Sequence, residues 1–217
     1  MVRLIDEYTD HQSGYLEEMI VSEVERADAA RNRQAILEAA DQLFSQSISP
    51  GAITMDDVAR AAGVGKGTLF RRFGDRSNLI RQVYARKLSS LRWLIESGPT
   101  PLGPSTPPSM RVAAIIDEIA QVKMQNACLT SALESADDAG TGGVYSSSTY
   151  REVHHLLTDL IMEHSDGATA SWTAHTLLTM VRADLLRHLT EGDGMSSEEV
   201  RRRLRQLVSH LVGPSEI

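Results

Sequence analysis

The sequence predicts an all-α protein with a small N-terminal helical domain followed by a larger helical domain. Apolar residues recur at helical spacing in most segments, and no segment alternates apolar and polar residues with the period of two that marks a strand. Five of the chain's 7 prolines fall within residues 98–109, which predicts a loop there. Glycines and helix-capping residues separate the other segments.

Length and composition place the chain among ordinary soluble globular proteins. Its 217 residues are 41% hydrophobic and 24% charged. No apolar run approaches the roughly 20 residues of a membrane span, and the acidic N-terminal segment lacks the apolar stretch of a secretory signal. A single cysteine excludes an internal disulfide and fits a reducing compartment. We therefore expect a cytoplasmic protein without membrane contact.

The first expected element is an extension over residues 1–28, in which Met19 is a candidate alternative start. An amphipathic helix follows over residues 31–46. Its apolar stripe consists of Ile36, Leu37, Ala40, Leu43 and Phe44. The run Ser49-Pro50-Gly51 then ends this helix.

Residues 53–80, ITMDDVARAAGVGKGTLFRRFGDRSNLI, predict two short helices joined by a glycine turn and the start of a third helix. Thr54 is placed to cap the first of them, and Asp57 completes a capping box. Gly63 stands at the turn, a position that tolerates positive φ. Leu69 and Phe73 are spaced to point inward from the second helix. This is the outline of a helix-turn-helix, whose second helix enters the DNA major groove.

Within this segment, DDVARAAGVGKGTLFRRFGDRSNL resembles the DNA-binding motif of the TetR family of one-component bacterial regulators. The family's Thr cap, Val-Ala-x-x-Ala-Gly-Val core and Gly-Thr-Leu run are present without gaps. Phe70 stands where the family has Tyr, so a phosphate-contacting hydroxyl is missing, whereas Arg72 replaces His and Arg76 replaces Lys. The resemblance implies a three-helix DNA-binding domain over residues 29–75 and a helical ligand-binding and dimerisation domain over residues 76–217.

Charge is divided unequally along the chain. The chain carries −7 overall, yet residues 31–93 hold 11 Lys and Arg against 5 Asp and Glu, a net +6, so the rest carries −13. A basic head on an acidic body confines the attraction for phosphate to the head. The residues expected to contact double-stranded DNA are Thr54, Gly65, Lys66, Gly67, Thr68, Phe70, Arg71, Arg72 and Arg76.

These DNA candidates have different expected roles. Lys66 and Arg76 stand near helix starts, where phosphate contact is favoured. Arg71 and Arg72 are suited to reading guanine edges. Phe70 is either a core residue or stacks against a sugar. The upstream arginines Arg26, Arg31 and Arg33 form either an arm on the DNA backbone or an ordinary charged helix start.

Further helices are expected beyond residue 75. A long one begins at its cap Asp75 and runs to about Ser97, where the Pro-rich loop over residues 98–109 begins. The remaining helical segments cover residues 110–135 with a break near Asn126, 146–164, 168–190, and a last helix that starts with a capping box at residues 196–199.

The resemblance places a ligand cavity and a dimer face on these helices. Met and aromatic residues suit an adaptable apolar pocket, although any helical core contains the same residue types, which favours a core role for each of them taken singly. The ligand candidates are Trp93, Met124, Cys128, Tyr145, Tyr150, His154, Trp172 and Met180. The segment 168–190 is apolar on more than one face and therefore needs more than one partner. These partners are either other helices of the same subunit or, as the resemblance implies, the same helices of a second copy in a homodimer. The interface candidates are Leu178, Leu185, Leu189, Val200, Leu204, Leu207 and Leu211.

Three other features have simpler interpretations. The basic run over residues 201–205 lies on the polar side of the last helix and predicts a solvated face with ion pairs. The histidines lack the spacing of metal ligands, so neither a metal nor another cofactor is expected. Cys128 has no activating neighbour in the sequence and is expected to pack as an apolar residue.

The sequence therefore predicts a homodimeric TetR-like regulator, most simply a repressor that a small apolar or amphipathic ligand releases from a palindromic operator. The alternative is a ligand-independent regulator on the same scaffold. An enzyme is a remote alternative, because the sequence lacks a nucleophile elbow, a phosphate loop, a metal cluster and evident paired carboxylates.

Overall fold

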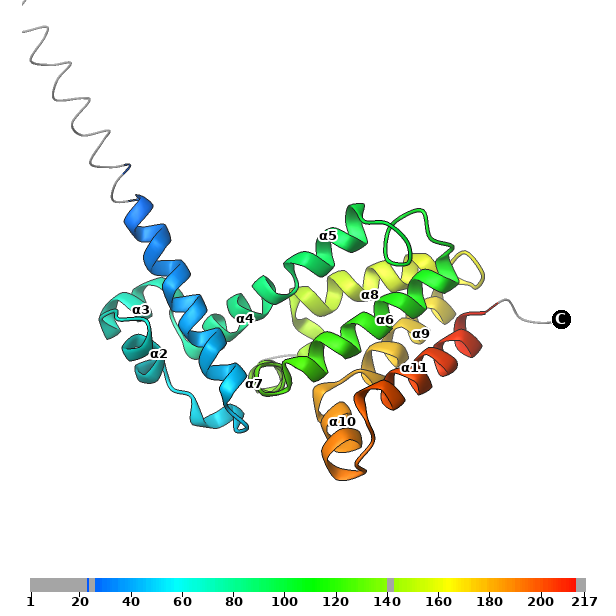
Figure 1. Cartoon of the computed structure of the whole chain (residues 1–217). Helices are drawn as coiled ribbons and strands as arrows, with labels where there is room; N and C mark the ends of the chain where they lie inside the picture. The colour runs from blue at the N-terminus through cyan, green and yellow to red at the C-terminus, as the bar shows by residue number, and fades with distance from the viewer. Residues whose placement is uncertain (1–22, 24–25, 140–142, 214–217) are drawn as a thin grey trace, which may run out of the picture.

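The computed structural model of this protein describes residue 23, residues 26–139 and residues 143–213. All regular structure in these ranges is helical, which confirms the predicted fold class. The molecule is elongated, with the N-terminal helices at one end and a larger helical bundle at the other (Figure 1). Met19 and most of the predicted extension over residues 1–28 lie outside the described residues.

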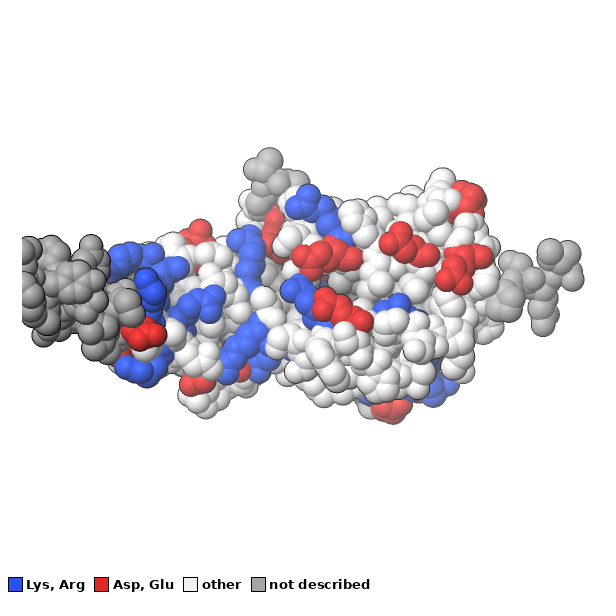
Figure 2. Space-filling view, turned by 90° about the horizontal axis from the view of Figure 1, so that it is seen from above, with Lys and Arg blue, Asp and Glu red and all other residues white. Residues whose placement is uncertain are grey.

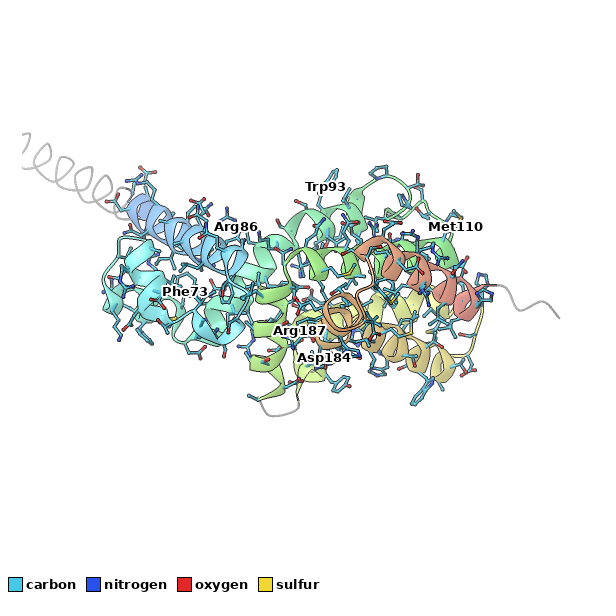
Figure 3. All side chains as sticks on the ribbon, turned by 60° about the horizontal axis from the view of Figure 1, so that its bottom comes forward. Phe73, Arg86, Trp93, Met110, Asp184 and Arg187 are labelled. Atoms are coloured by element: carbon cyan, nitrogen blue, oxygen red, sulfur yellow. The ribbon has the colours of Figure 1, made fainter. Side chains whose placement is uncertain are left out.

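The N-terminal domain is built from the first helix, residues 26–46, followed by α2 (Met55–Ala61) and α3 (Lys66–Phe73). Its core is apolar, and its largest fully buried side chains include Ile36, Leu69 and Phe73. Figure 3 shows Phe73 lying among these helices. The capping box is confirmed, because Thr54 Oγ1 accepts from the backbone N–H of Asp57 at 3.2 Å and the Asp57 carboxylate accepts from that of Thr54 at 3.0 Å.

Helix α4 (Arg76–Lys87) leads out of the N-terminal domain, and Asp75 caps it as predicted by accepting from Asn78 N–H at 2.7 Å. Its buried residues belong to the N-terminal core, which also takes in Leu129 and Ala132 from α7 (Ala127–Asp138). The two predicted domains therefore meet through a continuous apolar contact.

The prediction of one long helix from Asp75 to Ser97 is wrong. Leu88 interrupts it, and α5 (Ser89–Ser97) begins there. At this break Ser89 Oγ donates to the Arg86 carbonyl at 2.8 Å, the kind of side-chain bond that competes with regular helix.

The C-terminal domain comprises α6 (Pro108–Gln125), α7, α8 (Ser148–Ile161), α9 (Gly167–Met180), α10 (Ala183–Arg187) and α11 (Ser197–Val212). Helix α6 lies between α8 and α11 and supplies much of the core (Figure 1). Asn126 separates α6 from α7 as predicted. Ser196 caps α11 by accepting from Glu199 N–H at 3.2 Å.

The Pro-rich loop ends slightly earlier than predicted, because α6 starts at Pro108. Proline suits the first turn of a helix, where its missing N–H costs nothing. Arg111 fastens the loop by donating to the carbonyl oxygens of Leu102 at 2.8 Å and Ile95 at 2.6 Å.

The predicted helix over residues 168–190 is also not continuous. It ends at Met180, resumes as α10 after an extended Arg182, and finishes in a five-residue π-helical turn, His188–Gly192. The break has a long-range cause: Ala183 N–H donates to the buried Glu134 carboxylate at 2.9 Å, and Arg182 donates to Asp138 at 2.8 Å.

Candidate nucleic-acid interface and internal cavity

The turn between α2 and α3 sets the direction of α3. Gly63 has φ +66°. At the end of α2, the backbone N–H groups of Gly63 and Val64 donate to the carbonyl oxygens of Arg60 and Ala59, respectively. Leu69 and Phe73 anchor α3 in the core, which leaves Gly67, Phe70 and Arg71 exposed on its outer side. The helix is thus presented at the surface, with both ends fixed by glycine-containing turns.

The basic side chains of α3 differ in their environments. Lys66 forms a surface ion pair with Asp56 of α2, with Nζ and Oδ1 2.8 Å apart. Arg71 is exposed and makes no hydrogen bond or ion pair with any described residue. Arg72 is half-buried, and its Nε is enclosed without an acceptor among the described residues. Arg71 is therefore the cation of this helix most available to a partner.

Arg76 and Phe70 sit differently from one another. Arg76 Nε donates to the Ile53 carbonyl at 2.9 Å, and its guanidinium lies 5.9 Å from the centre of the Phe44 ring, so the side chain braces the domain. Phe70 is 40% exposed, which removes the core alternative and leaves a surface role. DNA contact by either residue stays a prediction.

Other arginines are held in contacts within the protein. Arg31 pairs with Asp28, and Arg33 donates to Gln82 at 2.6 Å. On α11, Arg201 and Arg205 both reach Asp117, at 2.6 and 2.9 Å.

The rest of the α11 run is paired within its own helix. Arg202 and Arg203 both donate hydrogen bonds to Glu199, and these bonds lower the pKa of the Glu199 carboxyl to about 2. The predicted ion-paired face over residues 201–205 is confirmed.

The surface charge follows the division seen in the sequence. On the face shown in Figure 2, Lys and Arg gather over the N-terminal helices, whereas Asp and Glu lie mainly over the C-terminal bundle. On this face the basic residues therefore lie over the N-terminal domain, which contains the helix-turn-helix.

A cavity of about 1210 Å³ opens in the C-terminal domain. Its walls come from α4, α5, α6, α7, the start of α8 and the end of α9. Of the predicted ligand residues, Tyr145 and Tyr150 line it, and burial raises the pKa of Tyr150 to about 12.

The other ligand candidates do not belong to the cavity lining: Trp93, Met124, Cys128, His154, Trp172 and Met180. Trp93 points away from the bundle (Figure 3) and Trp172 is 74% exposed. Met124 and Met180 pack against the C-terminal core, and Cys128 packs against the N-terminal core. An aromatic or sulfur-containing side chain on an amphipathic helix can face either way, and the sequence pattern did not separate these cases.

Sequence reasoning missed the charged side of the cavity. Lys123 Nζ lies 2.6 Å from the Glu134 carboxylate, which also lies 3.8 Å from Arg182. Close by, Arg81 of α4 donates twice to Asp137, at 3.0 and 3.1 Å. The available signal was the pair of acidic residues at i and i+3 within the apolar pattern of residues 127–138.

His154 lies beside the cavity in an aromatic cluster between α8 and α9. The imidazole centres of His154 and His175 are 3.9 Å apart, and Tyr150 Oη lies 2.6 Å from His175 Nδ1. Partial burial and the neighbouring His154 lower the pKa of His175. Among the described residues no group of three or more His, Cys, Asp or Glu is arranged to hold a metal ion.

The predicted dimer residues fall into two groups. Leu178, Val200 and Leu204 are buried within the subunit, and Leu189 packs on the same core. Leu185, Leu207 and Leu211 are at least 39% exposed on α10 and α11. None of the helices described here has the length and apolar character needed to cross a bilayer.

Comparison with known proteins separates the functional alternatives. Residues 36–83 match the family model for bacterial regulatory proteins of the tetR family. An HTH-type transcriptional regulator from Staphylococcus aureus is 31% identical over 144 residues, which cover 66% of this chain and 75% of the relative. The chain belongs to the TetR family. A second S. aureus regulator is 28% identical over 191 residues, covering 88% of this chain and 100% of the relative.

Solved structures agree with this assignment at the level of the fold. A TetR transcriptional regulator from Rhodococcus sp. RHA1 has a TM-score of 0.64 at 15% identity, covering 87% of this chain and 100% of that chain. NalD, the secondary repressor of the MexAB-OprM multidrug efflux pump in Pseudomonas aeruginosa, has a TM-score of 0.59 at 16% identity, covering 88% and 100%. TetR-family proteins are DNA-binding transcriptional regulators rather than enzymes, which excludes the enzyme alternative.

Proposed function

We propose that this TetR-family protein is a homodimeric repressor that acts in the cytoplasm and is released from a palindromic operator by a small molecule in the C-terminal cavity. The observation that carries the proposal is that α4 residues on the cavity wall also hold the DNA-binding helices. Asn78 donates through Nδ2 to the Phe73 carbonyl at the end of α3, at 2.8 Å. Gln82 accepts from Arg33 of the first helix at 2.6 Å.

These two contacts suggest how occupancy of the cavity acts on the operator. A ligand that displaces Asn78 or Gln82 moves the end of α3 and the first helix with α4. In a dimer, the two recognition helices must stand one DNA turn, about 34 Å, apart to enter successive major grooves. A conformation with a different spacing loses operator affinity, provided that the ligand binds that conformation better.

The exposed apolar side chains of α10 and α11 support dimerisation. Leu185 lies on α10, whereas Leu207 and Leu211 lie one turn apart on α11. A face of this kind is costly to leave in water, and a two-fold axis lets the same face on a second copy cover it. Trp172 on α9 adds a large exposed ring to the same set of C-terminal helices.

The size of the cavity favours the ligand-responsive form over a ligand-independent regulator. At about 1210 Å³ it exceeds the roughly 300–1,000 Å³ of typical small-molecule sites, so side chains do not fill it. NalD, which has the same fold, is itself described as a repressor. Repression, rather than activation, is the simplest outcome of a protein that occupies DNA until a ligand removes it.

Selection of bound DNA from a random pool by the full chain tests the DNA part of the proposal. We expect a palindromic site, an affinity that falls steeply with salt, and two subunits per site in sedimentation. A panel of apolar and amphipathic compounds, screened first for binding to the protein, then tests release. Cavity ligands that leave operator affinity unchanged would favour the ligand-independent alternative, and a monomer bound to a non-palindromic site would refute the dimer.

A further inference from the structure

One side of the cavity is polar, and three helices and the junction between two others contribute to it. Tyr84 and Arg81 come from α4, Lys123 from α6, Glu134 from α7, and Arg182 from the junction of α9 and α10. Tyr84 is only 6% exposed, and the Lys123 side chain is 17% exposed. Tyr84 and Lys123 are therefore largely removed from bulk water, whereas the Arg81 side chain is 47% exposed.

The acceptors on this side of the cavity are mostly satisfied. One oxygen of Glu134 binds Lys123 at 2.6 Å, and the other accepts from Ala183 N–H at 2.9 Å. In Asp137, both Arg81 bonds converge on Oδ1, which leaves Oδ2 as the one carboxylate oxygen of the pair without a bond to a described residue. A cationic ligand would have to use this oxygen or displace Arg81 or Lys123.

The donors are less satisfied. An ammonium group offers three N–H donors, and Lys123 uses one of them on Glu134. The Tyr84 hydroxyl makes no hydrogen bond to any described residue, although the side chain is buried and lines the cavity. Both residues line the cavity, so an acceptor on a ligand can take up these remaining donors there.

The remaining walls are largely apolar. Leucine, isoleucine and valine side chains run from the polar side along α5, α6 and α8. The residues that form this wall are Leu88, Leu91, Ile95, Ile119, Val153 and Leu156. A ligand that satisfies both regions has one polar end and an extended apolar part.

We propose that the cavity binds an amphipathic carboxylate, whose oxygens accept hydrogen bonds from Lys123 and Tyr84 while its hydrocarbon part lies along the apolar wall. The inference deepens the proposed function, because it assumes that this cavity is the effector site. A carboxylate at this position also draws Lys123 away from Glu134, which connects ligand charge to the group that caps α10.

Three probes with the same chain and different head groups test the head-group chemistry. Calorimetry of the full-length protein is carried out with decanoate, decanol and decylamine, each below the concentration at which it self-associates. We expect decanoate to bind at least about tenfold more tightly than the other two, since a charge-assisted hydrogen bond distinguishes it. Tighter binding of decylamine would overturn the proposal and indicate that the head group contacts Asp137. Equal binding of all three probes would also overturn it, because only the hydrocarbon part would then be recognised. No binding of decanoate would overturn it outright.

Substitutions then assign the contact. Lys123→Met should lower the affinity for decanoate about tenfold or more. Tyr84→Phe, which keeps the ring and the fold, should lower the affinity for decanoate several-fold without changing the affinity for decanol. Arg92→Met is the matched control, because Arg92 also lines the cavity but is paired with Glu152 near the surface. Decanoate affinity lost in Arg92→Met and kept in Tyr84→Phe would refute the assigned position.

Operator binding measured in parallel separates this inference from the proposed function. If decanoate binds through Lys123 and Tyr84 but the operator stays occupied, the cavity binds an amphipathic carboxylate as proposed, but this ligand does not release the protein from DNA. If decylamine or decanol releases the protein from the operator and decanoate does not bind, release by a cavity ligand is supported and the carboxylate inference is refuted.

Discussion

Replacing Glu134 by Gln tests the buried charge cluster as a stabilising element of the C-terminal domain. The Glu134 side chain is 8% exposed and binds Lys123, Arg182 and the N–H of Ala183. Breaking a buried ion pair from one side typically costs about 3–5 kcal/mol. The amide oxygen of Gln can still accept from Ala183 and Lys123 is not fully buried, so we expect Glu134→Gln to lower the free energy of unfolding by about 2–3 kcal/mol.

Urea unfolding at one fixed protein concentration measures this loss, because dimerisation would add to the apparent stability. For a chain of this size, the same loss corresponds to a fall in Tm of roughly 5–10 °C. Glu152→Gln is the control, since the Glu152–Arg92 pair has a similar 2.7 Å distance but side chains 57% and 56% exposed. Such a surface pair contributes less than about 1 kcal/mol.

The expected loss of stability depends on burial rather than on the number of ion pairs. Equal losses in Glu134→Gln and Glu152→Gln would refute it. A double variant, Lys123→Met with Glu134→Gln, sharpens the test: removing both charges should cost less than the sum of the single substitutions, because neither charge is then left alone in the interior.

Three further predictions concern the DNA-binding domain and the histidine cluster. Arg71→Ala should weaken operator binding and reduce the salt slope by about one unit, whereas Arg202→Ala on the acidic body should change neither; an unchanged slope in a filter-binding titration would remove Arg71 from the interface. Thr54→Ala should lower the free energy of unfolding by about 1 kcal/mol through loss of the α2 cap, measured against Thr169→Ala at the start of α9. The lowered pKa of His175 means that the unfolded chain binds its proton more readily, so stability should fall as the pH drops from about 7 to 5. His175→Asn should flatten this part of the stability profile, and an unaltered profile would assign the effect to other groups.

Local signals in the sequence predicted much of the fold correctly. The capping box at Thr54, the cap at Asp75 and the break at Asn126 each depend on residues a few positions apart. These interactions are complete within one turn of helix, so tertiary packing has little power to override them.

Features set by distant partners were not predictable in this way. The break between α9 and α10 depends on Glu134, which lies 49 residues before Ala183. The inward turn of Arg76 depends on the Ile53 carbonyl, 23 residues earlier. Likewise, Tyr145 and Trp172 look alike as pocket candidates in the sequence, and only the packing of α8 and α9 decides that one lines the cavity and the other faces outward.

Under the proposed function, we expect the polar side of the cavity to matter more for regulation than the apolar wall, because of the acidic turn of α7. Asp137 holds Arg81 on α4, which carries the DNA-binding domain, while Glu134 caps α10, which carries the exposed Leu185. An apolar ligand surface can pack against either of two neighbouring wall arrangements with little difference in free energy, whereas a charged head group is sensitive to which ion pairs are intact. Since a ligand shifts an equilibrium only by its differential affinity for the two states, we expect that difference to arise at the head group and its effect to reach α4 and α10 through one turn of α7.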